Sequence, residues 1–392
     1  EVPQPLIESA LLEELADETV TADSVGEVDC IFLTGLYLAE RGIADQIKRI
    51  RTGALPWPEI DADKALPWIE RKTSIKLAAS QTEAIRIALR SKVTVITGGP
   101  GVGKTTIVNS ILRILAVKRV KLLLCAPTGR AAKRMTEATG MEAKTIHRLL
   151  EFDPKTAGFK CNDENPLDCD LLVIDETSMV DVLLMQSLMK AVPTAAALLI
   201  VGDINQLPSV GPGQVLADII GSGAVPVMRL TEVFRQAAKS KIITTAHAIN
   251  EGRMPDLGKP NGDADFYFVS ADDPEQAVTR IVGLVAKRIP RRFGFDPIKD
   301  IQVLCPMNRG GVGARSLNIE LQAALNPAGE KKVERFGWTF APGDKVMQIE
   351  NDYDKDIYNG DIGMIEDVDV DEGELGVDFD GRTVTFAFGE LD

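Results

Sequence analysis

The sequence predicts an α/β protein in which helices cover a parallel sheet, with a helical region before it and a small β module after it. Three observations support this fold class. Between residues 73 and 236, short continuous apolar runs alternate with helical stretches, as in a parallel sheet buried on both faces. One of these runs leads into a glycine-rich loop and a helix. From about residue 343 the chain becomes a series of short β-runs separated by turns.

Length and composition restrict the protein class. A chain of 392 residues should hold two or more domains, because single cores rarely exceed about 250–300 residues. Its 45% hydrophobic and 26% charged residues are typical of globular proteins. The chain has no apolar run near the ~20 residues that span a bilayer and no signal-peptide pattern at its N-terminus. We therefore expect no membrane partner.

Net charge and cysteine content bear on the ligands and the cellular compartment of the protein. A net charge of −14 argues against coating DNA by bulk electrostatics but leaves room for a local basic channel. The five cysteines are scattered and, with two histidines, they form no zinc-binding spacing. A reducing cytoplasm is the simplest localisation.

The first two regions follow from this pattern. Residues 1–72 are expected to be helical, with a break at the Pro56-Trp57-Pro58 cluster. Residues 73–236 form the first α/β domain. Its predicted strands, besides the one before the glycine-rich loop, are Lys121–Ala126, Leu171–Asp175 and Ala197–Val201. Residues 152–170 are polar and rich in turn formers, which predicts a small β-hairpin inserted between two core strands.

The remaining chain is predicted to hold a second α/β unit and the β module. In residues 237–342, Ile301–Cys305 is expected to be a central strand and Gly313–Leu325 a helix. Residues 343–392 form the β module, with Asn359-Gly360 as a strong hairpin turn. The β-runs of the module are Lys345–Ile349, Gly363–Ile365, Gly376–Phe379 and Thr383–Phe388.

The glycine-rich loop matches a phosphate-binding pattern. In VITGGPGVGKTT, residues 95–106, the spacing is Gly98-x-x-x-x-Gly103-Lys104-Thr105. The apolar run before it predicts a strand, and residues 105–115 predict a helix with apolar residues on one face. In this strand–loop–helix order, backbone N–H groups and the helix dipole both point at an anion. The sequence therefore predicts a nucleoside triphosphate site.

Each part of the loop has an expected role. Lys104 should reach the β and γ phosphates, and the Thr105 hydroxyl should ligate Mg²⁺. ATP and Mg²⁺ are therefore the expected ligands. The loop residues expected to surround the nucleotide are Gly99, Pro100, Gly101, Val102, Gly103, Lys104, Thr105 and Thr106.

Two more strand ends carry polar groups. Asp175 and Glu176 end an apolar strand, so Asp175 is expected to hold Mg²⁺ and Glu176 to orient or deprotonate the attacking water. The strand at 197–201 runs into an amide- and glycine-rich loop, where Gln206 is expected to sense the γ-phosphate. The carboxyl ends of parallel strands share one edge, where ligands bind.

Taken together, these motifs resemble the RecD-like superfamily 1 DNA helicases, the exodeoxyribonuclease V alpha-subunit and TraA-like family. The helicase portions of conjugative relaxases are similar too. GGPGVGKTT resembles motif I, CAPTGRAAKRM motif Ia, VIDETSMV motif II, GDINQLPSVGPG motif III and LTEVFRQ motif IV. KTIHRLL matches the segment after motif Ia. VLCPMNRGGVGARSLN and GDKVMQIENDYDKDIYNGDIG resemble the second motor domain and the start of an inserted SH3-like module.

The resemblance implies a fold and site residues that spacing alone does not. It implies tandem RecA-like P-loop motor domains, the second of them partial, and an SH3-like C-terminal module. Gln81 resembles an adenine-reading glutamine, and Arg235 an arginine that reaches the γ-phosphate. The positions that resemble DNA contacts are Pro127, Thr128, Gly129, Arg130, His147, Asn308 and Arg309.

The resemblance also implies an activity. The chain is expected to be an ATP-hydrolysing helicase or translocase that moves on single-stranded DNA, 5′ to 3′, and acts at duplex junctions in DNA repair or recombination. Residues 152–170 resemble the pin that separates duplex strands. Motif V and the arginine-bearing motif VI have no match before Asp392, so we expect the chain to be incomplete at its C-terminal end and weak in hydrolysis.

Three alternatives stay open at this point. The chain could be a non-motor ATP switch that acts as a binding module, which DNA-stimulated hydrolysis would distinguish. It could be the helicase portion of a conjugative relaxase, although only His147 and His247 are available for the three-histidine metal cluster of such an enzyme. A nuclease subunit is the third, and no clustered nuclease pattern favours it. Protein partners are not predicted.

Overall fold

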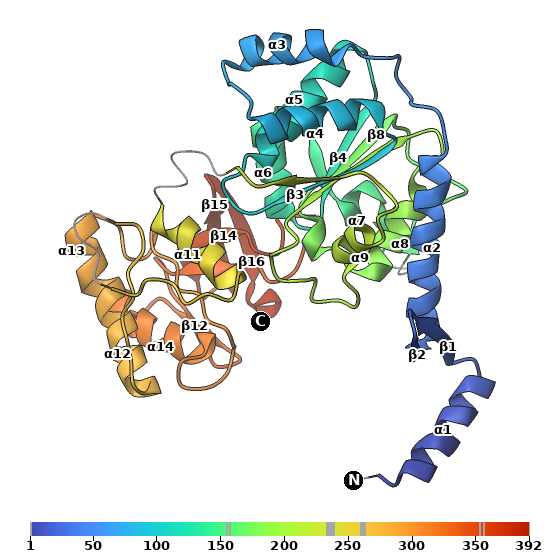
Figure 1. The fold of residues 1–392 in the computed structure, drawn as a ribbon. Helices are drawn as coiled ribbons and strands as arrows, with labels where there is room; N and C mark the ends of the chain where they lie inside the picture. The colour runs from blue at the N-terminus through green and yellow to red at the C-terminus, as the bar shows by residue number, and fades with distance from the viewer. Residues whose placement is uncertain are drawn as a thin grey trace. The chain divides into compact units, whose positions relative to one another are not determined.

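The computed structural model describes residues 2–153, 156, 158–232, 240–258, 264–352, 354–355 and 357–391. The chain forms two compact units, residues 1–256 and residues 257–392, coloured from blue to yellow and from orange to red in Figure 1. Each unit is described by itself below. Within the described ranges, every helix is too short or too polar to cross a bilayer.

The N-terminal region is helical only in part. The prediction of helix throughout residues 1–72 is wrong for β1 (Val20–Val25) and β2 (Val28–Leu33), which pair as an antiparallel hairpin. Its loop is only two residues long, and Gly26 supplies the positive φ of 63° that such a loop requires. The helices of this region are α1 (Gln4–Ala16), α2 (Thr34–Arg51) and α3 (Ala62–Thr73).

Helix α2 packs the N-terminal region against the rest of the first unit. Ala39, Ile43, Ile47 and Ile50 recur on one helical face and are buried. They belong to the same apolar cluster as α8 (Val182–Ala191), beside which α2 runs in Figure 1. The Arg49 guanidinium also donates to the carbonyl of Val192 just after α8, over 2.8 Å. The interruption of the helix predicted at the Pro56-Trp57-Pro58 cluster lies between α2 and α3.

A six-stranded parallel sheet forms the centre of the first unit, as predicted. Its order is β10-β3-β9-β8-β4-β5, and every pairing within it is parallel. The strands are β3 (Val93–Gly98), β4 (Leu122–Ala126), β5 (Ala143–Thr145), β8 (Leu171–Ile174), β9 (Ala197–Gly202) and β10 (Val227–Leu230).

Helices cover both faces of this sheet. Along β9, Leu198 and Ile200 pack into one apolar cluster, and Leu199 and Val201 into the other. The two-residue repeat of a strand therefore supplies both cores. Helices α2, α8, α7 (Ile146–Leu149) and α9 (Val215–Gly221) lie on the first face. Helices α3, α4 (Ala79–Arg90), α5 (Lys104–Val117) and α6 (Gly129–Thr139) lie on the second.

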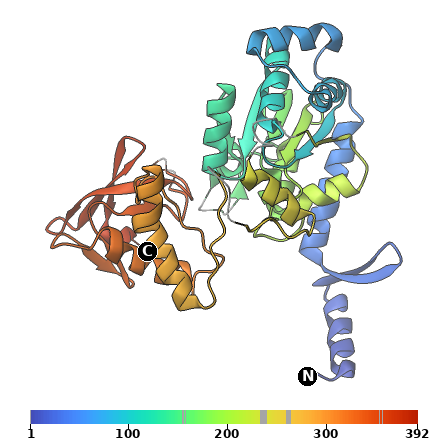
Figure 2. The same cartoon turned by 60° about the vertical axis from the view of Figure 1, so that its left-hand side comes forward.

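Two smaller features complete the first unit. A short hairpin, β6 (Phe152–Asp153) with β7 (Gly158–Phe159), lies between β5 and β8 in the sequence, where an inserted hairpin is predicted. A 3-10 turn, η1 (Thr177–Met179), follows β8, and helix α11 (Lys241–Asn250) comes after β10 along the chain. Figure 2 shows the same elements from a second direction.

The second unit begins with helices rather than with a parallel sheet. The prediction of a strand at Ile301–Cys305 is wrong, because the segment is irregular and pairs with no strand among the described residues. Instead, the Lys345 ammonium donates to the Ile301 carbonyl over 2.6 Å. The helix predicted at 313–325 is present as α14 (Ala314–Leu325). The other helices are α12 (Pro274–Gly283), the π-helical turn η2 (Leu284–Arg288) and α13 (Ile289–Phe293).

The C-terminal β module is present as predicted. A four-stranded antiparallel sheet has the order β13 (Lys345–Met347), β14 (Ile362–Asp369), β15 (Glu374–Phe379) and β16 (Arg382–Ala387). The hairpin β11 (Val333–Arg335) and β12 (Trp338–Phe340) precedes it, and η3 (Phe388–Glu390) follows it. Asn359-Gly360 does form a turn, with Gly360 at φ 92°, but within the long connection between β13 and β14.

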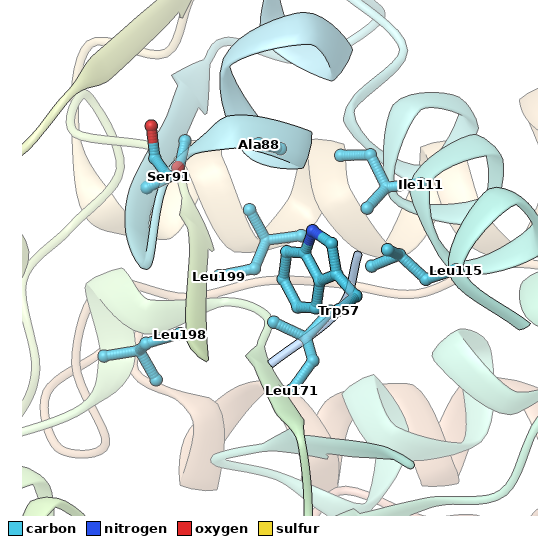
Figure 3. A pocket seen from close by; sticks show the side chains of 9 residues that line it. Trp57, Ala88, Ser91, Ile111, Leu115, Leu171, Leu198 and Leu199 are labelled. Atoms are coloured by element: carbon cyan, nitrogen blue, oxygen red, sulfur yellow. The ribbon is translucent and has the colours of Figure 1, made fainter. Parts of the chain in front are cut away.

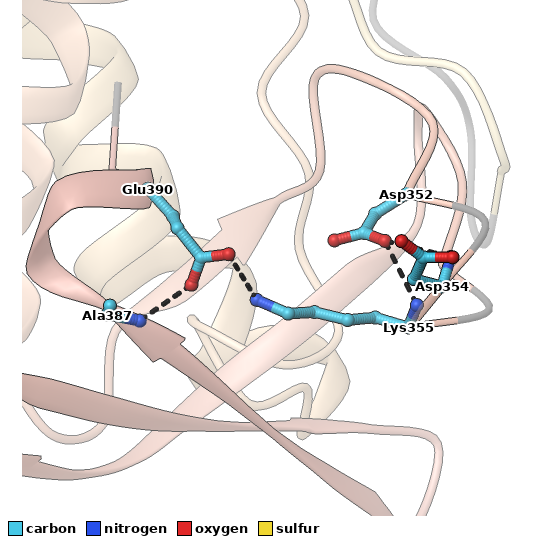
Figure 4. A network of polar contacts seen from close by, with 5 residues as sticks. All are labelled: Asp352, Asp354, Lys355, Ala387 and Glu390. Carbon is cyan, nitrogen blue, oxygen red and sulfur yellow. Dashed lines mark hydrogen bonds and ion pairs between the residues drawn. The ribbon is translucent and has the colours of Figure 1, made fainter. Parts of the chain in front are cut away.

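That long connection is pinned to the end of the module by Lys355, as Figure 4 shows. The Lys355 ammonium lies 2.8 Å from a Glu390 carboxylate oxygen and 4.3 Å from the centre of the Phe386 ring. The second Glu390 oxygen accepts from the backbone N–H of Ala387. One lysine therefore joins a loop, a strand and the final turn.

Candidate nucleotide site

The phosphate loop lies between β3 and α5, at the carboxyl edge of the parallel sheet. Gly101 and Gly103 adopt positive φ values of 77° and 82°, which glycine alone reaches at no steric cost. Gly103 is also the residue that precedes α5. Pro100 and Gly101 are exposed, whereas Val102 is buried. The buried Val102 side chain therefore anchors the loop in the core, and the tip of the loop at Pro100 and Gly101 faces solvent.

Gly98 is required at the end of β3 for reasons of space. A Cβ atom at this position would lie 2.8 Å from the Leu230 carbonyl oxygen and 2.9 Å from a Val102 methyl group. Leu230 belongs to β10, which pairs with β3 in register at Gly98. The first glycine of the loop thus allows the neighbouring strand to approach.

Lys104 and Gln81 both bind carbonyls of the loop. The Lys104 ammonium donates to the carbonyls of Gly98 and Gly99 over 2.5 and 3.2 Å. The buried Gln81 amide donates to the Val102 carbonyl over 3.1 Å and accepts from the Ala78 N–H over 3.0 Å. Gln81 therefore supports the phosphate loop, and its role in reading adenine stays a prediction.

Asp175 and Glu176 follow β8 on the same edge. Burial raises the pKa of the Asp175 carboxyl, while a hydrogen bond from the Glu176 N–H and the nearby Lys104 charge oppose that rise. Burial also raises the pKa of Glu176, and the Asp175 charge adds to the effect. The Glu176 Oε2 atom is buried and has no hydrogen-bond partner within the described ranges.

The structure adds one acidic residue that the sequence reasoning missed. Asp203 follows β9 and is only 2% exposed, and its charge also contributes to the raised pKa of Glu176. Its carboxylate accepts from the Asn205 N–H over 3.0 Å. The signal was available, since Asp203 ends a strand on the edge that carries Asp175. Gln206 lies three residues further on and is exposed.

The residues present suit a magnesium ion. Asp175 and the exposed Thr105 hydroxyl offer hard oxygen ligands, which Mg²⁺ prefers. The unpartnered Glu176 oxygen lies in the same acidic group. A divalent cation would also offset the charge of these desolvated carboxylates. Thr106, the last expected nucleotide contact, is half-buried on the first turn of α5. Arg235 lies in residues 233–239, outside the described residues.

The predicted DNA contacts after β4 occupy the start of α6. Pro127 and Thr128 are half-buried, Gly129 is buried and Arg130 is exposed. The Thr128 hydroxyl caps α6 by accepting from the Ala131 N–H over 3.2 Å. Arg130 is therefore free to meet a phosphate backbone, whereas Thr128 has a structural task already.

His147 and the residues of the second unit differ from these. The His147 ring packs on Phe152 and Phe159 of the β6–β7 hairpin, with centroids 5.9 and 5.7 Å apart. Burial lowers the pKa of His147, although the Asp181 charge opposes the shift. The ring packs against the hairpin, and its role as a DNA contact stays a prediction. Asn308 and Arg309 are exposed in the second unit, just before α14.

A separate hollow in the first unit, shown in Figure 3, belongs to the core. Trp57, Ile111 and Leu199 are among the side chains that line it, and it has room for about one water molecule. The Thr94 hydroxyl on its wall has no partner among the residues described. A single water would satisfy this hydroxyl. A space of that size is too small for a nucleotide, so the hollow is not a nucleotide pocket.

Comparison with protein families agrees with this geometry. Residues 81–212 match the model of an AAA domain, a range that contains the phosphate loop and both acidic strand ends. Residues 317–379 match the model described as the ATP-dependent RecD-like DNA helicase SH3 domain. The second match begins within α14 and ends with β15.

Individual relatives extend the similarity along the chain. The chain is 36% identical to the ATP-dependent RecD2 DNA helicase of Deinococcus radiodurans over 362 residues, which are 92% of this chain and 47% of that protein. It is 30% identical to the RecBCD enzyme subunit RecD of Mycolicibacterium smegmatis, over 93% of this chain and 68% of that protein. The chain thus spans about half the length of the first relative.

Among solved structures, the fold is similar to one of two Pif1 helicases coordinating on forked double-stranded DNA. That match has a TM-score of 0.45 and 19% identity, and it covers 80% of this chain and 76% of the other. The family rests instead on the sequence relatives and the two domain models, together with a phosphate loop and acidic strand ends in the expected places. The chain belongs to the RecD-like helicase family.

Proposed function

We propose that this chain is the motor part of an ATP-dependent DNA helicase. One observation carries the proposal: Lys104 at the start of α5 and the adjacent Asp175 and Glu176 after β8 meet at one edge of the sheet, where their charges influence one another. That arrangement suits phosphoryl transfer from ATP to water. The similarity to RecD and RecD2 supports DNA as the track.

Each residue has a distinct task in the proposed hydrolysis. Lys104 leaves the loop carbonyls and neutralises the β and γ phosphates. Thr105 and Asp175 would hold Mg²⁺, which neutralises charge on the phosphate oxygens. Glu176 accepts a proton from the attacking water, and its raised pKa makes it a stronger base than an exposed carboxylate. Gln206 and Arg235 are the proposed γ-phosphate contacts from neighbouring segments.

DNA would be bound beside this edge. We assign backbone phosphates to the segment Pro127–Arg130, in which Arg130 is exposed and can pair with a phosphate. The β6–β7 hairpin, supported by His147, is the proposed pin at a duplex junction. Asn308 and Arg309 are proposed DNA contacts of a second motor domain, which would begin with the second unit at residue 257 rather than at the predicted residue 237. Movement 5′ to 3′ and a role in DNA repair or recombination are proposed from the resemblance to RecD-like helicases.

The setting is proposed to be the cytoplasm. All five cysteines are free thiols, which fits a reducing compartment.

The decisive experiment measures ATP turnover by a full-length protein, with and without single-stranded DNA. Turnover that rises on DNA addition supports a motor, whereas ATP binding with turnover indifferent to DNA would favour a non-motor switch. Lys104→Ala should lose nucleotide binding because the phosphates lose their cation. Arg130→Ala should weaken DNA binding while it leaves ATP binding intact, and it serves as the matched control.

A second experiment tests the pin in a full-length protein. Replacing the hairpin tip with a short glycine linker should spare DNA-stimulated turnover and reduce unwinding of a forked duplex. Unchanged unwinding would reduce residues 152–170 to an ordinary loop.

A further inference from the structure

The His247 side chain of helix α11 contacts the phosphate loop. If Gly99 carried a Cβ atom, it would lie 3.1 Å from the Cε1 atom of His247 and 3.7 Å from its Nε2 atom. The imidazole ring therefore lies directly on the second glycine of the loop. His247 is far from the loop in sequence, and neither periodicity nor motif spacing indicated this contact.

The tip of the ring is buried although its helix is not. No residue of α11 is fully buried, and Ile242 and Ile249 on the same helix are more than half exposed. The Nε2 atom of His247 nevertheless has almost no contact with solvent and no hydrogen-bond partner among the residues that the structure describes. A buried polar atom without a partner is rare in proteins and calls for an explanation, such as a catalytic role or a bound water or ion. Beside a phosphate loop, a ligand oxygen is such an explanation.

The position of the ring identifies which ligand group that is. Gly99 touches the His247 ring on one side, and its carbonyl accepts from the Lys104 ammonium over 3.2 Å. Phosphate-loop lysines reach the β and γ phosphates. His247 and Lys104 thus flank the same glycine, at the end of the loop that receives the outer phosphates of a nucleoside triphosphate.

We propose that His247 is a further nucleotide-binding residue, whose Nε2–H donates a hydrogen bond to an oxygen of the terminal phosphate. The inference rests on the proposed ATP site and deepens it. Donation to a charged oxygen satisfies the buried nitrogen, which a neutral imidazole can do in one tautomer. Because α11 meets the loop through this ring, the bond also makes the position of α11 depend on the terminal phosphate.

Equilibrium binding tests the proposal with two ligands. Calorimetry on the chain with Mg²⁺ compares a non-hydrolysable ATP analogue, which has a terminal phosphate, with ADP, which lacks it. His247→Phe keeps a ring of similar shape and removes the donor. A hydrogen bond to a charged group corresponds to roughly 10- to 100-fold in affinity. We expect a loss of that size for the ATP analogue and a change of less than about 2-fold for ADP.

Three variants serve as controls. His247→Gln retains a donor and should restore most of the affinity for the ATP analogue. Asn250→Ala alters an exposed residue of the same helix and should bind both ligands like wild type. Lys104→Ala should lose both ligands, and if the wild type itself binds neither ligand, the ATP site fails rather than the role of His247.

Two results would overturn the role of His247. Equal weakening of both ligands by His247→Phe would show that the ring only supports the loop. Unchanged affinity for the ATP analogue would show that the ring takes no part.

Amide hydrogen exchange of α11 in the wild-type chain is a second test, and it needs no variant. The ATP analogue should slow exchange in this helix and ADP should not, whereas equal effects of the two ligands would contradict the proposal.

Discussion

Replacing Gly98 by alanine should loosen the first unit at its phosphate loop. The new methyl group would meet the Leu230 carbonyl oxygen at 2.8 Å, a Val102 methyl carbon at 2.9 Å and the Leu230 Cβ atom at 3.0 Å. Two of these three atoms cannot rotate away, because they belong to the backbone and Cβ of β10. Either β10 moves from β3 or the loop moves from both.

Overpacking of this kind costs about 1–3 kcal/mol of the free energy of unfolding. For a unit of this size, each kcal/mol lowers the melting temperature by about 2–4 °C, so Gly98→Ala should melt roughly 2–12 °C below wild type in differential scanning calorimetry. ATP binding should weaken as well, since the loop begins at this residue. Gly221→Ala is the matched control, because a Cβ atom there meets nothing within 4 Å and alanine favours the helix. Equal melting temperatures for Gly98→Ala and wild type would refute the packing argument.

Three further outcomes are expected. Glu176→Gln should keep ATP binding and lower turnover by about 10²–10⁴-fold. It should also raise the melting temperature at neutral pH. Burial raises the pKa of Glu176 in the folded chain. The stability that Glu176 contributes is therefore full below its unfolded pKa near 4.5 and is lost as pH rises. The gain in melting temperature from Glu176→Gln should accordingly vanish toward pH 4 in a pH series of melting curves. Burial raises the thiol pKa of Cys125 and raises that of Cys169 to about 12. Iodoacetamide at pH 8 should therefore leave both cysteines unlabelled in mass spectra, while the half-exposed Cys30 reacts. Equal labelling of the three cysteines would contradict the burial of Cys125 and Cys169. Lys355→Met should lower the stability of the β module by about 1 kcal/mol in urea unfolding, since it breaks the ion pair and the ring contact of that lysine, and an unchanged midpoint would show that neither matters.

The sequence alone determined the elements whose signals are local. The phosphate loop and its flanking strand and helix depend on residues within about a dozen positions of one another, and all lie where the pattern predicts. The strands β4, β8 and β9 were equally clear because a strand buried on both faces is apolar throughout. The same locality explains the four strands of the β module, each of which is bounded by turn residues.

Local patterns failed where pairing partners decide the structure. Ile301–Cys305 has the composition of a strand, but a strand forms only where a neighbouring strand offers backbone hydrogen bonds. No strand among the described residues pairs with this segment. The hairpin of β1 and β2 shows the reverse error. Its helical reading ignored the two-residue loop at Gly26, whose backbone brings the strands together.

The site divides in the same way. Motif order alone placed Lys104, Asp175 and Glu176 in one site, because parallel strands bring their carboxyl ends to one edge. Asp203 follows a predicted strand and could have been placed beside Glu176 in the same way. Only the tertiary structure shows the Gln81 amide bound to the loop and the His247 ring on Gly99. These contacts join segments with no shared periodicity, and the physical reason is that packing, rather than sequence spacing, brings such side chains together.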